Sequence, residues 1–595
     1  MKVLKKKKLH SLLEKVDQLI SKANEYEDRY FKEIEAVHPE YKKSALNLVH
    51  YMAIMGEDLK DLEDDLTEMS IMLSIKAPTH IIFSLYAIRK IINKLLNNDT
   101  LSGVQPAVTR KKSRKILKRH KKALLGGKIK GSKTRIMVTL PTDAANFKEF
   151  IPELVDAGMS AARINCAHDD TIVWKKMIDR INTVKKRTGR NVKISMDLGG
   201  PKLRTGTMQP GPKIIHLQPE RNSFGNVINP ARVLLVKDIH ENLYEDILQL
   251  PLSESLLKHL KPNDELHFID TRGKKRKLII ESVNNEKIEA KCFDSAYIIT
   301  GTQLTLDTGG QGITDKVGEI LPKEESIILK KFDTLLIHKE NVPGEPALYN
   351  ENGVLEKTAH ISCTLPDIFK DVKKDEIIVF DDGKIEGVIK EINNDELTIE
   401  ITHAKDGGAK LKADKGINLP ESNLSIRGLT DKDKTDLEFI LLHSDIVNMS
   451  FVNDVEDVKD LQQVLKDFQK ENFGVIYKIE TKKGVNNLPK ILLTAMQYFP
   501  FGVMIARGDL AIEIGWKNLG KAQEQILRIC NAAHIPIVWA TQVLETMAKK
   551  GRPSRAEITD ASMAERTDCV MLNKGPYINE TIKTLEEILT IAEER

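Results

Sequence analysis

The stretch that decides the fold is Gly474-Val475-Ile476-Tyr477-Lys478-Ile479-Glu480, a short β-type apolar run that ends in charged residues. Eight such runs occur in the second part of the chain, and their starts lie 26 to 33 residues apart except across one long gap. They are 134–140, 160–166, 192–198, 445–451, 474–480, 502–507, 535–541 and 568–573. Most intervals carry a helical pattern, and strands that alternate with helices at this period indicate a parallel sheet. Eight units predict an α/β fold, a closed (β/α)8 TIM barrel with its active site at the C-terminal ends of the strands.

A long β-rich segment, 207–425, interrupts this series after the third strand. Two stretches of this segment each resemble a later stretch in sequence. Residues 261–268 align with 372–379 at an offset of 111, and 283–289 align with 392–398 at an offset of 109. We therefore expect a duplicated lid insertion of two related β-modules, about 207–315 and 316–425, that could close over the mouth of the barrel.

The chain before the barrel falls into two parts. Residues 1–98 carry apolar residues at helical spacing, for example from Leu9 to Ala23, which predicts an all-α N-terminal domain. In the following segment, 99–132, nine of the thirteen residues from Arg110 to Lys122 are Lys or Arg. We interpret this segment as a linker or a solvated helix face. A nucleic-acid or acidic-partner surface is less favoured because no aromatic residues are interleaved. The barrel then divides into strands 1–3 at 133–206 and strands 4–8 at 426–595.

Composition excludes several classes of protein. A chain of 595 residues with 41% hydrophobic and 30% charged residues is too apolar for wholesale disorder. The net charge of +5 comes from one segment. Residues 100–142 hold thirteen Lys or Arg and no acid, so the remaining residues of the chain have a net charge of −8. The five cysteines lie far apart without a CxxC pair, which argues against a disulfide framework or a zinc ribbon. No apolar run reaches about 18 residues. We expect a soluble, cytoplasmic protein without membrane partners.

Charged and hydroxyl residues gather at the predicted C-terminal ends of the strands. Glu480 and Asp509 suit Mg²⁺, which takes one or two carboxylates plus substrate oxygens. Arg163 and Arg204 offer planar guanidinium groups to phosphate. Lys478 lies two residues before Glu480, so both side chains face the same side of their strand. The inventory favours phosphoryl transfer or enolate chemistry.

Each of these residues has a simpler interpretation when it is taken alone. A single Lys or Glu at a strand end is more often part of a structural or surface ion pair, and Thr541 could be only a helix N-cap. Because five strand ends carry complementary polar groups, we favour one common site.

At these segments the chain resembles pyruvate kinase. The most specific motifs are Met504-Ile505-Ala506-Arg507-Gly508-Asp509-Leu510 and Ala540-Thr541-Gln542-Val543-Leu544-Glu545, and the resemblance covers about 133–206 and 370–575. It implies that Glu480 and Asp509 bind Mg²⁺ or Mn²⁺. It also implies that Lys478 and Arg163 act on the phosphoryl group, that Thr541 lies near the enolate face that is protonated, and that Arg204 lies at the nucleotide phosphates. Substrate would contact Arg163, Lys478, Ala506, Arg507, Gly508, Asp509 and Thr541.

Departures from the family pattern carry further expectations. Lys202 stands where K⁺-dependent members carry Glu, so with Asn165 and Asp197 it would form a substitute for the K⁺ site, and activity would not require K⁺. The loop after strand 8 reads Asn573-Lys574-Gly575-Pro576, which differs from the family's Ser-Gly-Glu-Thr, and the first loop also differs. The family's C-terminal regulatory domain has no counterpart before Arg595. These differences bear mainly on the part of the site that would bind the nucleotide.

Three functions follow from the sequence. The first is Mg²⁺-dependent phosphoryl transfer between phosphoenolpyruvate and ADP to give pyruvate and ATP. The second is metal-dependent enolate chemistry on another phosphorylated or pyruvate-like acid. The third is a catalytically silent scaffold whose basic segment, 110–122, binds a partner or nucleic acid. An oligomer is compatible with all three.

Overall fold

The computed structural model describes residues 2–69, 78–98, 106–127, 134–239, 248–284, 287–306, 312–323 and 325–593. The chain divides into two compact units. The first consists of Met1–Leu203, Leu365–Ile389 and Gly416–Arg595, and the second of Arg204–Thr364 and Lys390–Lys415. Residues 99–105 and 128–132 of the basic segment and Asn285 and Glu286 of the repeat lie outside the described residues. No helix in the described ranges is both long enough and apolar enough to cross a membrane.

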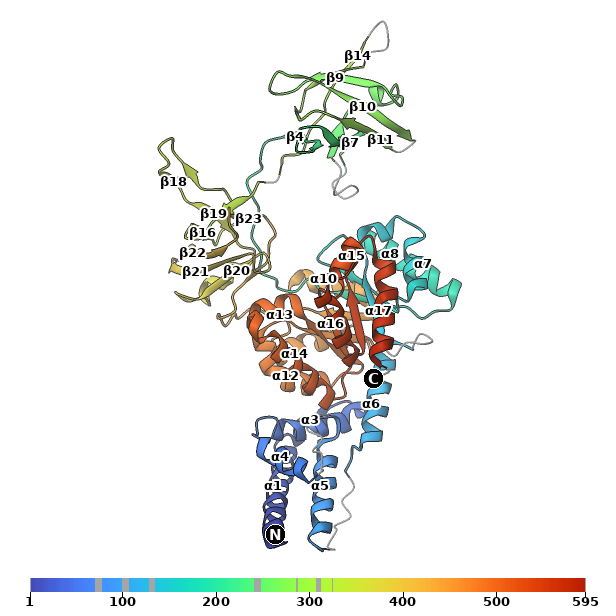
Figure 1. Cartoon of the computed structure of the whole chain (residues 1–595), viewed down its shortest axis with the longest axis vertical. Helices are drawn as coiled ribbons and strands as arrows, with labels where there is room; N and C mark the ends of the chain where they lie inside the picture. Colours follow the sequence, from blue (N-terminus) through green and yellow to red (C-terminus); the bar gives the residue numbers. More distant parts are fainter. Residues whose placement is uncertain are drawn as a thin grey trace. The chain divides into compact units, whose positions relative to one another are not determined.

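The first unit is built on the predicted closed barrel of eight parallel strands, which helices surround (Figure 1). Seven predicted runs each contain one strand, and the eighth, 502–507, overlaps a strand that begins one residue earlier. In order around the barrel they are β1 (Arg135–Thr139), β2 (Ala161–Asn165), β3 (Lys193–Asp197), β25 (Ile446–Met449), β26 (Gly474–Ile479), β27 (Phe501–Ala506), β28 (Ile537–Ala540) and β29 (Cys569–Leu572). The register pairs Asn165 with Asp197 and Lys478 with Met504, so the polar strand ends lie at one rim.

The barrel helices begin where the sequence supplies caps. Asp170, Thr430 and Asp454 each accept backbone N–H groups of the first helical turn, and the last two form capping boxes. The helices are α7 (Phe150–Ala157), α8 (Thr171–Thr188), α10 (Asp431–His443), α11 (Val455–Asp467), α12 (Lys482–Ala495), α13 (Arg507–Ile514), α14 (Leu519–Ala532), α15 (Glu545–Lys550), α16 (Arg555–Met563) and α17 (Ile578–Glu593).

The N-terminal region is helical, as predicted, and it packs directly on the barrel. Its helices are α1 (Lys2–Arg29), α2 (Phe31–Ala36), α3 (Lys42–Ile54), α4 (Lys60–Glu68) and α5 (Ile81–Leu95). Their buried residues belong to the same hydrophobic cluster as those of the barrel helices. The buried Tyr41 hydroxyl accepts a hydrogen bond of 3.1 Å from the backbone N–H of Phe501, at the start of β27. This region therefore shares its core with the barrel.

The basic segment forms helix α6 (Arg110–Leu125), which closes the N-terminal end of the barrel. Leu124 and Leu125 are buried in the cluster that fills the barrel interior, together with Ile476 and Met504. Leu124 lies so close to the backbone that a Cβ added at Gly502 would be 2.6 Å from its Cδ2. The helix thus has one buried apolar face, and its solvated face carries the cations.

The second unit contains most of the predicted β-rich insertion. Its largest sheet has seven strands in the order β14 (Ile313–Lys316), β13 (Gln303–Leu306), β9 (Glu265–Ile269), β10 (Lys275–Asn284), β11 (Lys287–Cys292), β7 (Ala231–Val236) and β8 (Leu248–Pro251). A separate apolar core lies under this sheet. Elsewhere in the unit, β16 (Thr334–His338) pairs with β19 (Ala359–Ser362) and β22 (Glu396–Ala404). The strands β20 (Ile377–Phe380) and β24 (Ile417–Asn418) and most of β21 (Ile385–Ile392) belong to the first unit.

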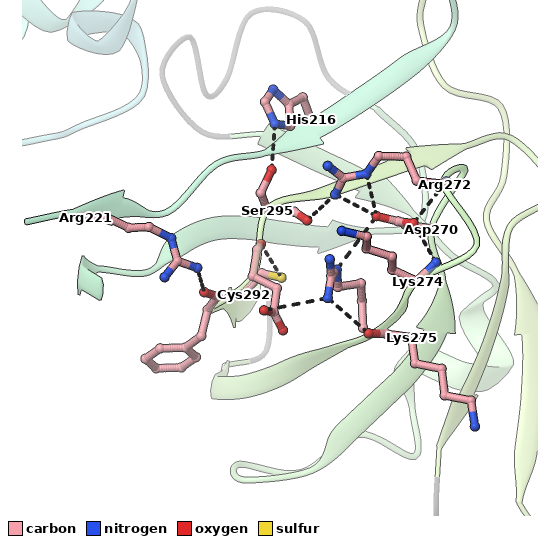
Figure 2. Close-up of polar contacts among 11 residues, drawn as sticks. His216, Arg221, Asp270, Arg272, Lys274, Lys275, Cys292 and Ser295 are labelled. Atoms are coloured by element: carbon pink, nitrogen blue, oxygen red, sulfur yellow. Dashed lines mark hydrogen bonds and ion pairs between the residues drawn. The ribbon is translucent and has the colours of Figure 1, made fainter. Parts of the chain in front are cut away.

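A polar cluster fixes the turn between β9 and β10 (Figure 2). Asp270 accepts hydrogen bonds from Arg272 Nη2 at 2.8 Å and from the backbone N–H of Lys274 at 3.0 Å. Arg272 also donates to the carbonyl of Ser295, whose hydroxyl is 3.1 Å from His216 Nε2. Because Asp270 is almost completely buried, these bonds satisfy a carboxylate that would otherwise be costly.

A similar turn occurs in both stretches that the sequence aligned, at an offset one residue larger than the aligned one. In each copy a Lys backbone N–H donates to an acid three residues later, and the residue before the acid has a positive φ. The positive-φ residues are Asn263 and Asp375, 112 positions apart, whereas the predicted alignment of 261–268 with 372–379 used 111. The same turn occurs a third time before β16, where Phe332 has a φ of 74°.

Candidate active site

Lys478 lies at the centre of a buried charge cluster at the C-terminal rim of the barrel. Its Nζ is 3.2 Å from Glu480 Oε1 and 3.4 Å from Asp197 Oδ2, and it donates to Ser450 Oγ at 2.7 Å. Ser450 in turn donates to the Leu198 carbonyl, which leaves its lone pairs for the ammonium. The structure thus brings the predicted Lys478 and Glu480 together with Asp197, which was predicted for the substitute of the K⁺ site, and adds Ser450.

Arg163 reaches the same cluster from β2. Its Nη2 is 2.7 Å from Asp197 Oδ2, and its Nη1 donates to Thr139 Oγ1 at 3.0 Å. Its Nε is buried and has no hydrogen-bond partner within the described ranges. A buried donor without a partner is costly in a folded protein unless a ligand satisfies it, so this N–H is suited to an anionic oxygen.

Asp197 and Lys478 are held in their ionised forms. Burial opposes the charge on Asp197, but Arg163 and Lys478 outweigh it and lower the pKa of that carboxyl to about 2. Burial also opposes the charge on Lys478, while Glu480 and Asp197 raise the pKa of its ammonium above the ordinary value. A permanently charged ammonium is therefore kept in a site with little water.

Glu480 and Asp509 form the second part of the site. Glu480 is buried and accepts the backbone N–H of Phe451 at 2.7 Å, and Asp509 Oδ1 is 2.8 Å from Lys202 Nζ. Burial raises the pKa of Glu480, and the nearby Asp509 raises it further. Two carboxylates that repel each other are stabilised by a divalent cation, and such a pair is what Mg²⁺ takes from a protein. No group of three or more metal-ligating side chains occurs among the residues described, so substrate oxygens and water would complete the shell.

The predicted turn after β27 and Thr541 also lie together. A Cβ added at Gly508 would be 3.0 Å from Thr541 Cγ2, so glycine permits this approach. The side chain of Arg507 points away from the turn: its Nη2 is 2.8 Å from Asp560 Oδ2, and its Nε donates to the Ala540 carbonyl at 2.8 Å. Thr541 has a φ of 72°, which is strained for a β-branched residue. Arg507 holds this strained backbone in place.

Sequence reasoning missed several polar residues of the site. Asn448 lies in the fourth strand and Ser450 directly follows it. The end of this strand contributed no predicted residue, although its position in the series was the available signal. Asn448 donates to Asp197, and Ser195 donates to Asn448 Oδ1 at 2.9 Å. Glu513 lies one turn after Asp509 on α13 and accepts a 2.9 Å hydrogen bond from Asn418 in β24.

Two cavities open at this rim. One of about 500 Å³ is lined by residues that include Lys202, Phe451, Thr481 and Glu513. Another of about 280 Å³ is lined by Arg163, Asn165 and His168 together with Thr142 and Lys574 from the two loops that depart from the family pattern. Asn165 lines this second cavity, and Lys202 lines the first. Arg204 belongs to the second unit, where it donates to the Asp414 carbonyl at 3.0 Å.

Comparison with known proteins gives a consistent result. The family model "Pyruvate kinase, barrel domain" matches residues 131–247 and 279–582. A pyruvate kinase of Staphylococcus saprophyticus is 26% identical over 470 residues, which cover 78% of this chain and 57% of the relative. A pyruvate kinase of Staphylococcus epidermidis is 33% identical over 278 residues, which cover 46% of this chain and 44% of the relative. The chain thus spans about half the length of these curated relatives.

A solved structure is similar in fold. The crystal structure of a pyruvate kinase from Cryptosporidium parvum matches with a TM-score of 0.51 and 22% identity, over 80% of this chain and 70% of that one. This likeness supports the barrel with its β-rich insertion.

Proposed function

The chain belongs to the pyruvate kinase family, and from this premise we propose that it interconverts phosphoenolpyruvate and ADP with pyruvate and ATP. It would use Mg²⁺ or Mn²⁺ and would not require K⁺. The observation that carries the proposal is the convergence of Lys478, Glu480 and Arg163 at the rim of the barrel where Asp509 also lies. The five cysteines are buried and form no disulfide, which supports a reducing, cytoplasmic location.

The chemistry assigned to the chain's own residues is mostly electrostatic. Glu480 and Asp509 would hold the divalent cation, which neutralises charge on the transferring phosphoryl group. The Lys478 ammonium would stabilise the negative charge that develops on the enolate oxygen as the phosphoryl group leaves. The unpartnered Nε–H of Arg163 would orient a phosphoryl oxygen. All of these groups are fixed before substrate binds, so little reorganisation is needed.

The turn that opens α13 would receive the substrate carboxylate. Backbone N–H groups from Ala506 to Asp509 begin a helix, where their dipoles favour an anion. Thr541, held against Gly508 by the Arg507 clamp, would lie beside the enolate carbon that gains a proton when pyruvate forms. In this proposal Arg507 acts by positioning Thr541, and it binds substrate only through its backbone.

Independence of K⁺ rests on Lys202. Its ammonium lies 2.8 Å from Asp509, and a Cβ on Gly416 would be only 3.1 Å from its Cε, so the side chain is confined. A tethered cation at this place would supply the positive charge that a bound monovalent ion supplies in relatives that carry Glu. The ammonium would move from Asp509 toward substrate oxygens when the divalent cation binds.

The cavity that would bind the nucleotide is also compatible with a second candidate function. The 280 Å³ cavity is lined by Arg163, Lys549 and Lys574, which suits phosphates and supports ADP as the acceptor. The same cavity is formed partly by loops that depart from the family pattern. This departure favours, as the alternative, metal-dependent enolate chemistry on another phosphorylated or pyruvate-like acid.

Pyruvate formation measured with purified full-length protein tests the proposal. Turnover should require phosphoenolpyruvate, ADP and Mg²⁺ together, and Lys478→Met should lower its rate about 100- to 1,000-fold while Mn²⁺ binding, followed by electron paramagnetic resonance, persists. Lys466→Met, which changes an exposed lysine on α11, is the matched control. Metal-dependent binding of phosphoenolpyruvate without ADP-dependent turnover would reject the kinase and leave the alternative.

A further inference from the structure

Helix α6 presents a stripe of cations that the barrel does not use. Seven of its nine Lys and Arg residues are exposed, namely Arg110, Lys111, Arg114, Lys115, Lys118, Arg119 and Lys122. They recur at positions i, i+1, i+4, i+5, i+8, i+9 and i+12, so they form one face about 18 Å long at a rise of 1.5 Å per residue. The family model begins at residue 131, after the helix ends.

Ion pairing within the protein neutralises little of this stripe. Arg119 pairs with Glu40, and the half-buried Lys121 pairs with Asp568. The other six exposed cations have no carboxylate within 4.0 Å among the described side chains. Lys112 lies against Lys43 from α3, and this like-charge contact together with partial burial lowers its pKa. The fold therefore concentrates positive charge here at an energetic cost.

The buried face of α6 fixes the stripe rigidly. Ser113, Ile116, His120, Leu124 and Leu125 are buried, and His120 Nδ1 is 2.8 Å from the His534 carbonyl at the base of the barrel. Plugging the barrel requires only this face. A flexible linker would have to lose conformational entropy before it could bind a partner, whereas this stripe is already ordered.

We propose that the exposed face of α6 binds the phosphate backbone of duplex nucleic acid without sequence preference. A single strand is less suitable because such proteins stack bases on aromatic side chains, and the stripe has none. A bilayer surface is less suitable because a membrane-bound helix inserts its apolar face, and that of α6 is buried in the barrel. An acidic protein is less suitable because protein interfaces have an apolar core, which the stripe lacks.

Salt dependence of duplex binding gives the first test. A 20-base-pair duplex with a fluorescent end label is titrated with the full chain, and anisotropy is followed. About four phosphate contacts give a slope of log K against log salt of about −3.6, so affinity falls roughly 150-fold from 50 to 200 mM salt. Absence of binding at 50 mM salt, or binding that does not depend on salt, would overturn the proposal.

Substitutions give the second test. The triple variant Lys111→Gln, Lys115→Gln, Lys118→Gln removes three exposed cations and should weaken binding at least 10-fold at 100 mM salt. The matched control Lys176→Gln, Lys186→Gln, Lys466→Gln removes three exposed helical lysines from the outside of the barrel and should bind as the wild type does. Equal weakening in both triple variants would refute a role for α6. Circular dichroism melts of both variants check that they fold.

Competing ligands give the third test. Vesicles with 30% phosphatidylserine and the single strand of the same sequence are titrated under the same conditions. Weaker binding of both than of the duplex supports the proposal. Tighter binding of the vesicles, or of the single strand, would replace it with a membrane or a single-strand surface.

Discussion

The contact between the N-terminal helices and the barrel should weaken in mild acid because it buries neutral histidines. His534 is completely buried at the end of α14, with Nδ1 3.0 Å from Ser44 Oγ and Nε2 2.8 Å from the Thr79 carbonyl. A carbonyl accepts only from N–H, so Nε2 carries the proton and Nδ1 accepts from Ser44. Burial lowers the pKa of His534 to about 4 from an ordinary 6.5.

The magnitude follows from the two pKa values. Between pH 6.5 and pH 4 the unfolded chain binds a proton at this residue that the folded protein does not, so the free energy of unfolding decreases as pH falls. The full difference between the two pKa values corresponds to about 3.4 kcal/mol, at 1.36 kcal/mol per pKa unit. Between pH 7.5 and pH 5.0 the free energy of unfolding decreases by about 2 kcal/mol. Burial also lowers the pKa of His80 and of His120, which adds to the loss with the same sign.

Hydrogen exchange measures this effect locally. Opening free energies of peptides from α3 and α14, corrected for intrinsic exchange rates, should fall by at least about 2 kcal/mol from pH 7.5 to pH 5.0. His534→Gln retains a donor for the Thr79 carbonyl but does not titrate, so its own change should be smaller by about 2 kcal/mol. His403→Gln, at an exposed position, should behave as the wild type does. If the wild type and His534→Gln lose equal stability, the histidine is not the cause.

Three further outcomes are expected. Lys478→Met should lower the rate of pyruvate formation about 100- to 1,000-fold, as loss of one charge-stabilising donor does, and a smaller loss would remove Lys478 from the chemistry. The wild type should change less than twofold on addition of K⁺ at fixed ionic strength, whereas Lys202→Glu should become K⁺-dependent; stimulation of the wild type would contradict the tethered-cation proposal. Leu124→Ala should lower the free energy of unfolding by about 2–5 kcal/mol in urea titrations, because it leaves a cavity in the barrel base, and an unchanged midpoint would show that the helix is not a plug.

The barrel could be predicted from the sequence because its signal is periodic and local. Each strand is a short buried run, and the runs recur at nearly constant spacing on both sides of the insertion. The candidate residues followed from the same periodicity, since the C-terminal ends of parallel strands meet at one rim. Lys478 and Glu480 were accessible in this way because two residues of one strand with a shared face need no tertiary information.

Other features depend on contacts between distant segments and left no local signal. Asp197 pairs with both Arg163 and Lys478, and only the closed barrel brings these three strands into register around it. The plug formed by α6 was hidden because three large apolar residues, Ile116, Leu124 and Leu125, are outnumbered by cations. The sequence alignment placed the two similar turns one residue out of register. The backbone φ defines such a turn, and side-chain similarity does not.

Helix α6 packs closely against two glycines at the base of the barrel. A Cβ added at Gly474, the first residue of β26, would lie 3.1 Å from Leu124 Cδ1, and one added at Gly502 would lie 2.6 Å from Leu124 Cδ2. Glycine weakens a strand interior, and at Gly502, inside β27, its presence is explained by the close approach of α6. At Gly474 the Ile446 side chain and the Asp445 carbonyl, at 2.9 and 3.0 Å, lie slightly closer than Leu124 does. Lys478 lies in the strand that Gly474 begins, and Glu480 directly follows that strand, so the plug supports the base of the strand that leads into the site. Helix α6, which lies outside the residues that the family model matches, is therefore part of the structure that supports the candidate active site.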